Sequence, residues 1–155
     1  MGYYDDTTNM IFSNAQVLST GAADSTNVID CQSSPTLRDL GIRPMFLKII
    51  VTTAFTAAGD GGSEFTHLVV GLKSDSNTNM DTSETEHISK SIALAALTLG
   101  AEFVIPLPRG QVYERYLGIE YTITGGENPT AGAVTALLVP SVDGRQFFAD
   151  GSSIS

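Results

Sequence analysis

Few side chains in this 155-residue sequence are of the types that perform chemistry. There are two histidines, His67 and His87, which lie 20 residues apart, and one cysteine, Cys31. A protein zinc site needs three or four ligands, and no close His-x-His pair with a following Glu is present. The sequence also lacks a Gly-x-Ser-x-Gly nucleophile motif and a Lys-Ser/Thr pair after the glycines of residues 59–62. We therefore predict that the protein is not an enzyme and has no catalytic, cofactor-binding or metal-binding residue.

One segment resembles a calcium-binding loop. Residues 75–86 place oxygen-bearing side chains at positions 1, 3, 5, 7, 9 and 12 of a twelve-residue calcium loop. Position 6 of such a loop turns sharply and requires glycine, whereas this sequence has Met80. The flanking segments are also predicted to be strands rather than helices. We interpret the segment as a polar loop between two strands.

A second segment contains residue types that are common in protein interfaces. Residues 106–116 hold Arg109 and Arg115, two of the eight basic residues, together with Tyr113 and Tyr116. Arginine and tyrosine are enriched among the residues that dominate binding energy. The alternative is a surface loop whose arginines pair with nearby acidic groups such as Glu114. Both interpretations are open at the level of sequence, and Arg109, Tyr113 and Arg115 are candidate interaction residues.

The two ends of the chain carry aromatic residues among polar ones. We predict an N-terminal arm over residues 1–9, a single domain over residues 10–141 and a C-terminal tail over residues 142–155. A segment of this kind can become ordered when it binds a partner. The further candidate interaction residues are therefore Tyr3, Tyr4, Phe147 and Phe148.

The charge of the chain excludes several kinds of partner. Eight basic and 17 acidic residues give a net charge of −9, and only 16% of residues are charged. Such a chain repels phosphate backbones, so we predict no nucleic-acid partner. No run approaches the ~20 apolar residues that span a bilayer, so we predict no membrane association. The N-terminus is acidic and lacks an apolar signal segment, which favours synthesis in the cytoplasm without a signal peptide. Cys31 is interpreted as a small buried residue.

Alternating hydrophobicity predicts a chain made of strands. In residues 116–124 the side chains of Leu117, Ile119, Tyr121 and Ile123 fall on one face, which is the two-residue period of a half-buried strand. The same period places Leu68, Val70 and Leu72 inward and Phe65, His67 and Lys73 outward in residues 64–74. Residues 45–54 are almost continuously apolar, as in a strand covered on both sides. The small residues of 131–139 indicate close approach of a neighbour. Shorter strands are predicted over residues 10–18, 25–31 and 102–107.

The segment over residues 88–99 fits both a helical and a strand period. We favour the strand, which places Lys90 on the inner face of the sheet. Glycine-rich turns at residues 58–62, 124–129 and 143–144 separate the predicted strands. The pattern predicts an all-β fold, an antiparallel β-sandwich or jelly roll of about eight strands with extended N- and C-terminal tails.

Several stretches of the sequence, in this order, are similar to a known protein family. They are Ser25-Thr26-Asn27-Val28-Ile29-Asp30, Phe46-Leu47-Lys48-Ile49-Ile50-Val51, Phe103-Val104-Ile105-Pro106-Leu107-Pro108, Arg115-Tyr116-Leu117-Gly118-Ile119-Glu120-Tyr121 and Pro129-Thr130-Ala131-Gly132. Over roughly residues 10–140 the chain resembles the jelly-roll cement (decoration) proteins of tailed bacteriophages, of the kind first met in a Bordetella podovirus. The N-terminal arm departs from that family.

The resemblance implies a structural protein of the virion. Such a protein would be made in the bacterial cytoplasm, bind the outer surface of the assembled major capsid protein lattice and bridge neighbouring capsomers. It would do so as a homo-oligomer, for which we favour a dimer over a trimer. The alternative function is a carbohydrate-binding jelly-roll module on a virion appendage, suggested by Tyr113, Tyr116 and Tyr121. A metalloenzyme of the cupin type is the third and least favoured alternative.

Overall fold

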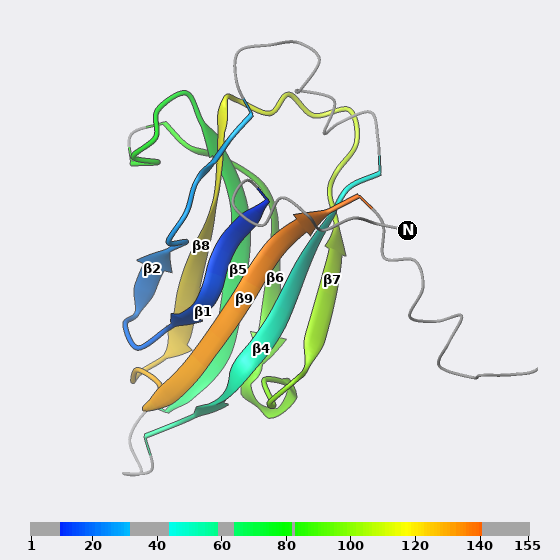
Figure 1. Cartoon of the computed structure of the whole chain (residues 1–155). Helices are drawn as coiled ribbons and strands as arrows, with labels where there is room; N and C mark the ends of the chain where they lie inside the picture. The colour runs from blue at the N-terminus through cyan, green and yellow to red at the C-terminus, as the bar shows by residue number, and fades with distance from the viewer. Residues whose placement is uncertain (1–9, 32–43, 59–63, 82, 141–155) are drawn as a thin grey trace, which may run out of the picture.

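The computed structural model describes residues 10–31, 44–58, 64–81 and 83–140. These residues form two antiparallel sheets that face each other (Figure 1). The first sheet contains, in spatial order, β1 (Ile11–Val17), β9 (Ala131–Val139), β4 (Phe46–Thr56) and β7 (Glu102–Pro106). The second contains β2 (Ala22–Asp24) with β3 (Ile29–Asp30), then β8 (Tyr116–Gly125), β5 (Phe65–Asp75) and β6 (Thr85–Ala93).

The connections between these strands define a jelly roll. The chain passes from one sheet to the other after β1, β3, β4, β6, β7 and β8. Among the described strands, β5 and β6 are the two that follow each other in sequence and also pair with each other. β2 and β3 pair with successive parts of β8, so the nine described strands fill eight positions. This arrangement is the two-sheet, double Greek-key jelly roll. The prediction of an all-β jelly roll of about eight strands is confirmed for the described part of the chain.

Alternate residues of the central strands fill the space between the sheets. Leu68, Val70 and Leu72 of β5 are fully buried, as predicted. Of their neighbours on β8, Tyr121 and Ile119 are also buried and Ile123 is half-buried. The first sheet contributes alternate residues of β4, which have no exposed surface. Each such side chain stabilises the fold by about 1.5–3 kcal/mol relative to leaving it in water. The facing residues are Leu47, Ile49 and Val51 of β4 and Leu117, Ile119 and Tyr121 of β8.

Two predictions about strand faces and ends were wrong. Phe65 was predicted to point outward but is buried, because the strand register shifts between Phe65 and His67. Its ring faces that of Phe55, and the two ring centres lie 5.8 Å apart. The strand predicted through residues 88–99 is confirmed only to Ala93. The next residues form the 3-10 helix η2 (Leu94–Ala96), because the chain must turn there from the second sheet to the first. Leu97, buried at 1% exposure, closes this end of the core.

The strand predicted over residues 25–31 was also too long. Only Ile29–Asp30 forms a strand, and β2 precedes the predicted segment. Between them the side chain of Ser25 takes the place of the regular ladder. Its hydroxyl accepts a hydrogen bond from the Ile119 amide (3.0 Å) and donates one to the Asn27 carbonyl (2.8 Å). Serine side chains compete with the backbone ladder in this way, and no hydrophobic pattern predicts it.

One open edge of the sandwich is protected by a charged residue. β6 and β7 are edge strands of their respective sheets. Lys90, predicted to point inward, lies with its ammonium group 5.9 Å from the centre of the Phe103 ring. An inward-pointing charge discourages pairing of an edge with another chain, and the aromatic face partly compensates the lysine.

Among the described residues no helix has the length and apolar character needed to cross a membrane.

Gly132 of β9 provides a test of the close approach that the small residues predicted. A Cβ atom at this position would overlap the ring of Phe55. We expect Gly132→Ala to lower the free energy of unfolding by about 2 kcal/mol, because a tightly packed ring must move. Gly21→Ala is the matched control, since the nearest atom to its Cβ would lie at 3.8 Å. Chemical denaturation of both variants measures the difference. Equal stabilities would contradict the close packing.

Candidate protein-interaction surface

The two outer faces of the sandwich differ in chemistry. On the second sheet, outward positions alternate with the buried ones and are mostly polar or charged. The cross-strand pairs Gly71–Glu120 and Lys73–Gly118 lie on this face. We call it the polar sheet face, and its other members are His67, Val69, Ser89, Ser91, Thr122 and Thr124. A polar outer face is the ordinary state of an antiparallel sheet with one side in water.

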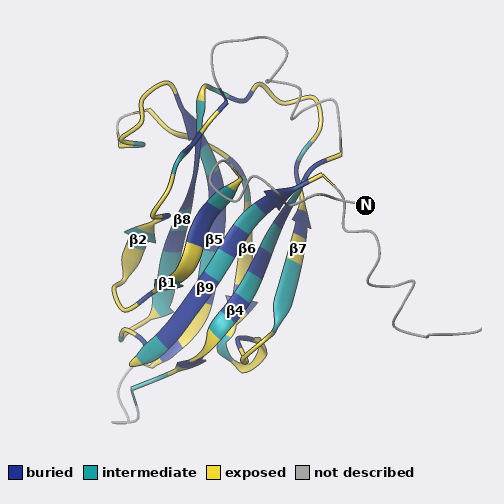
Figure 2. Ribbon diagram, in the orientation of Figure 1, coloured by how far each residue is buried: buried dark blue, intermediate teal, exposed yellow. Residues whose placement is uncertain are grey.

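The outer face of the first sheet is apolar instead. Its residues alternate with the core residues of β1, β4, β7 and β9, and the pairs Phe46–Val139 and Lys48–Leu137 fix which side chains share it. We call it the apolar sheet face. Its polar members include Thr135, which stands opposite Ile50. Its apolar members are Ile11, Phe46, Ile50, Val104, Pro106, Leu137 and the fully buried Val139. Figure 2 shows β9, β4 and β7 toward the viewer, coloured mainly as buried or half-buried.

One ion pair interrupts the apolar sheet face. The ammonium group of Lys48 lies 3.3 Å from the carboxylate of Glu102, and both side chains are largely covered. These two charges cancel, so this face is neutral in a protein whose net charge is −9. Contiguous apolar surface on a folded domain marks a site of interaction with another protein or a ligand. The prediction that residues 45–54 are covered on both sides is corrected: the core covers one side, and the other side lies in the middle of this face, between β9 and β7.

The loop between β7 and β8 places the three predicted site residues differently. Arg109 is exposed and has no ion-pair partner among the described residues. The guanidinium of Arg115 donates to both carboxylate oxygens of Asp30, at 2.9 and 2.8 Å, and lies 4.8 Å from the centre of the Tyr116 ring. Hydrogen bonding to Asp30 raises the pKa of Arg115. The ion-pair interpretation therefore holds for Arg115, with Asp30 rather than Glu114 as partner.

Tyr113 lies inside the protein and does not offer a surface for contact. Its side chain is only 2% exposed, and its hydroxyl donates to the carbonyl of Pro108 at 2.9 Å. Burial raises the pKa of this hydroxyl. The adjacent Val112, which the sequence did not single out, is 82% exposed. An isolated exposed valine in a loop has no periodic pattern by which it could be found.

Two of the three tyrosines that suggested sugar binding are buried. Tyr121 is 1% exposed, as its inward position predicted, and its hydroxyl lies 2.7 Å from that of Ser13 within the core. Burial raises the pKa of Tyr121 strongly. Tyr116 is partly covered by Arg115. Stacking on a sugar requires an accessible aromatic face. Tyr113 and Tyr121 offer none.

A buried polar network holds the β7–β8 loop against the second sheet. His87 lies 2.6 Å from the hydroxyl of Ser74 through Nε2 and 2.7 Å from Oε1 of Gln111 through Nδ1. Because Oε1 can only accept, Nδ1 donates and Nε2 accepts from Ser74. The Ser74 oxygen in turn accepts from the Glu114 amide at 3.1 Å. A register shift in β6 next to His87 explains why a residue outside the period-2 pattern is buried.

This network has the atom order of a serine nucleophile with a histidine base, but it is placed inside the fold. The side chain of Ser74 has no exposed surface, so its oxygen cannot meet a substrate. The ring of Tyr113 covers His87 at a centroid distance of 4.2 Å. The residues come from β5, β6 and the loop, and no local sequence pattern links them. The arrangement acts as a brace for the loop.

In the loop with calcium-like spacing, hydrogen bonds from within the loop occupy one carboxylate oxygen of its first residue, Asp75. Oδ1 of Asp75 accepts from the Asn77 amide at 3.0 Å and from the Ser83 hydroxyl at 3.2 Å. The bond from Asn77 is the main reason why the pKa of Asp75 is lowered. Met80 adopts φ = +53°, so the sharp turn exists without glycine. Within the described ranges no three His, Cys, Asp or Glu side chains are grouped to hold a metal ion.

The remaining predicted site residues cannot be placed. Tyr3, Tyr4, Phe147 and Phe148 lie outside the described residues. The domain limits at residues 9 and 141 fall at the margins of the described chain and are not tested. Cys31 is buried, at 7% exposure.

The fold and its two unlike faces define an all-β jelly-roll protein with one apolar outer face. The chain belongs to the Bbp16 family, whose sequence model matches residues 12–138. The matched range runs from the first residues of β1 to the last residues of β9 and so includes both sheets. No curated protein matches the sequence.

The brace around His87 is testable by comparing the two histidines. We expect His87→Ala to lower the free energy of unfolding by about 2–3 kcal/mol, because it removes a buried ring and leaves the buried Ser74 hydroxyl without an acceptor for its proton. His67→Ala is the control, since His67 is exposed on the polar sheet face, and we expect a change below about 0.5 kcal/mol. Chemical denaturation at neutral pH measures both. Equal losses would contradict the brace.

Proposed function

We propose that this protein is a structural component of a tailed-phage virion that binds the outer surface of the assembled major capsid protein lattice. In this role it bridges neighbouring capsomers and stabilises the shell. The observation on which the proposal rests is the apolar sheet face, because it is a neutral, apolar surface on a strongly acidic domain. A surface of this kind stabilises a contact between proteins when it leaves water.

Family and resemblance support the phage context. The name of the Bbp16 family suggests a Bordetella phage protein. The chain also resembles jelly-roll cement proteins of tailed phages across its two sheets. The buried position of Ser74 gives the one serine–histidine pair of the described chain no route to a substrate, which favours a binding role over a catalytic one.

The physical properties of the domain suit a lattice binder. A net charge of −9 keeps free copies apart in solution. When copies bind side by side on a lattice, linked weak contacts gain strength through effective concentration. We propose a homodimer as the binding unit, with a trimer as the alternative, in keeping with the closed symmetry of most oligomers. Light scattering on the free protein distinguishes the two.

The proposal predicts that the protein sediments with purified phage shells and that one substitution weakens this binding. We expect Leu137→Glu to weaken shell binding at least about tenfold, because it places a charge within the apolar sheet face. Lys48 lies directly beside residue 137 and can pair with the new carboxylate, so the fold should persist. Co-sedimentation over a range of protein concentrations measures the affinity.

The control for this experiment has the same charge change on the opposite side of the sandwich. Thr122→Glu places a carboxylate on the polar sheet face, and its shell binding should match that of the unmodified protein. Circular dichroism confirms that both variants are folded. If the unmodified protein fails to sediment with either expanded or unexpanded shells, the proposed function is wrong. If Thr122→Glu is the defective variant, the binding face is wrong.

A further inference from the structure

The polar sheet face contains a cavity at the end nearest the β5–β6 loop. Its volume is 170 Å³, and it lies between β2, β8, β5 and residues 78–80 of that loop. A cavity of about 150 Å³ holds one benzene-sized group, whereas sites for drug-sized ligands begin at about 300 Å³. The cavity therefore has room for a single side chain. It lies on the opposite side of the sandwich from the apolar sheet face.

Gly118 of β8 leaves room for this hollow, whereas the carboxylate of Glu86 lies over Gly71, which does not line it. Lys73 of β5 stands opposite Gly118 of β8, and Glu120 of β8 stands opposite Gly71 of β5. Each long charged side chain therefore stands opposite a glycine, which has no side chain. Met80 reaches over Gly118, where a Cβ atom would lie 3.1 Å from its methyl carbon. A glycine inside a strand often marks a place where another group approaches closely.

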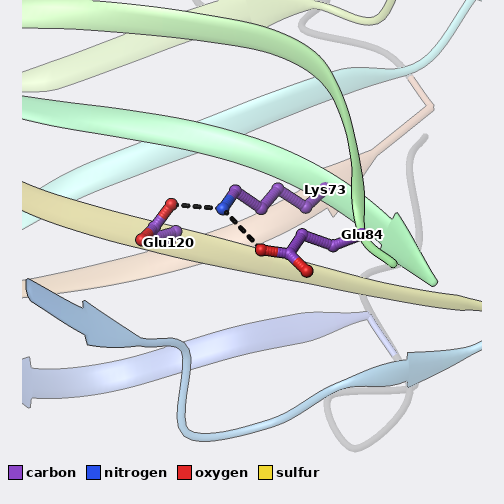
Figure 3. A network of polar contacts seen from close by, with 3 residues as sticks. All are labelled: Lys73, Glu84 and Glu120. Atoms are coloured by element: carbon purple, nitrogen blue, oxygen red, sulfur yellow. Dashed lines mark hydrogen bonds and ion pairs between the residues drawn. The ribbon is translucent and has the colours of Figure 1, made fainter. Parts of the chain in front are cut away.

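The charges around the cavity are unbalanced. The ammonium group of Lys73 pairs with the carboxylates of Glu120 and Glu84, as Figure 3 shows. A third carboxylate, that of Asp24, lines the cavity from β2, directly opposite Glu120 in the register of the two strands. The carboxylate of Glu86, the residue opposite Lys73 on β6, lies over Gly71 in the same cluster. Four carboxylates and one ammonium group give a net charge of −3. Like charges directly opposite each other on neighbouring strands destabilise a sheet.

The state of Asp24 reflects this imbalance. Its pKa is raised, first by partial burial and then by the negative charges of Glu120 and Glu84, which outweigh the attraction of Lys73. Asp24 is exposed, so solvent weakens this repulsion and its effect on stability is modest. An unfavourable local arrangement that persists in an otherwise consistent fold is typical of a binding site, where a partner supplies the missing charge.

We propose that this cavity receives one arginine side chain of a protein partner. The guanidinium would lie between Asp24 and Glu120, where its planar fork matches two carboxylates. The aliphatic stem would lie along the side chains of Val28 and Met80, which line the cavity. The partner contributes the positive charge that the cluster lacks. This site does not depend on the proposed capsid role, because its evidence lies on the other face.

The test uses the full-length protein and short peptides as probes. The peptide acetyl-Ala-Arg-Ala-amide is titrated into isotope-labelled protein while the amide signals of Gly118 and Glu120 are followed by NMR. The control peptide contains citrulline, which has nearly the shape of arginine but no charge. We expect saturable shifts with a dissociation constant of about 1–10 mM for the arginine peptide, as for a single exposed charge contact. Binding of the citrulline peptide should be at least about fivefold weaker.

Matched variants locate the binding to the cavity. We expect Asp24→Asn to weaken binding of the arginine peptide about threefold, in line with the loss of one partly exposed ion pair. Glu64→Gln changes the charge equally at the other end of the sandwich and should leave the affinity unchanged. Equal binding of the two peptides, absence of saturable shifts, or equal effects of the two variants would each overturn the proposal.

Stability provides an independent readout for Asp24. Because the pKa of Asp24 is raised in the folded state, its ionisation lowers stability as the pH rises above its unfolded value of 3.8. Asp24→Asn should therefore increase the free energy of unfolding at pH 7, and the increase should shrink as the pH falls toward 3.8. Chemical denaturation at a series of pH values measures this. A loss of stability at pH 7 would show that Lys73 already compensates Asp24, and the argument for a missing cation would fail.

Discussion

Cross-strand register is the constraint on which the other features of this protein depend. Side chains in a strand alternate between two faces, so a shift of one residue would exchange the core with the outer surface. In the first sheet the pairing of Ile49 with Ala136 and Phe103 directs one set of residues inward. The same pairing gathers Phe46, Ile50 and Leu137 on the outside. The apolar sheet face is thus a direct consequence of the register that builds the core.

The same constraint explains how much could be predicted. Regular alternation correctly predicted that Leu68, Val70 and Leu72 of β5 and Leu117, Ile119 and Tyr121 of β8 are buried, because burial on one face leaves a two-residue period. The continuous apolar run in β4 indicated that both sides are apolar, but a sequence cannot state whether the second side meets the protein itself or another molecule. That distinction depends on tertiary structure, and it separates a wholly internal strand from one that forms an interaction surface.

Other features could not be predicted because irregular pairing produces them. A register shift turns Phe65 inward, and another lies beside His87, which the sequence treated as an isolated histidine. Ser25 replaces ladder bonds with its side chain, which interrupts the strand between Asp24 and Ile29. The cavity beside Gly118 requires the β5–β8 register and the fold of the β5–β6 loop together. Each of these features depends on residues far apart in the chain.

The two faces are suited to different kinds of contact, and the difference follows from how each excludes water. The apolar sheet face has its one ion pair satisfied internally, so covering it removes apolar surface from water with no unpaired charge left behind. The cavity on the polar sheet face has the opposite character, because carboxylates outnumber ammonium groups around it. A cation that enters it gains an attraction which salt weakens, whereas contact through the apolar face is much less sensitive to salt. A jelly roll with these two surfaces can therefore hold one partner by burial and recognise a second by charge, and the rigid core between them keeps both surfaces in place.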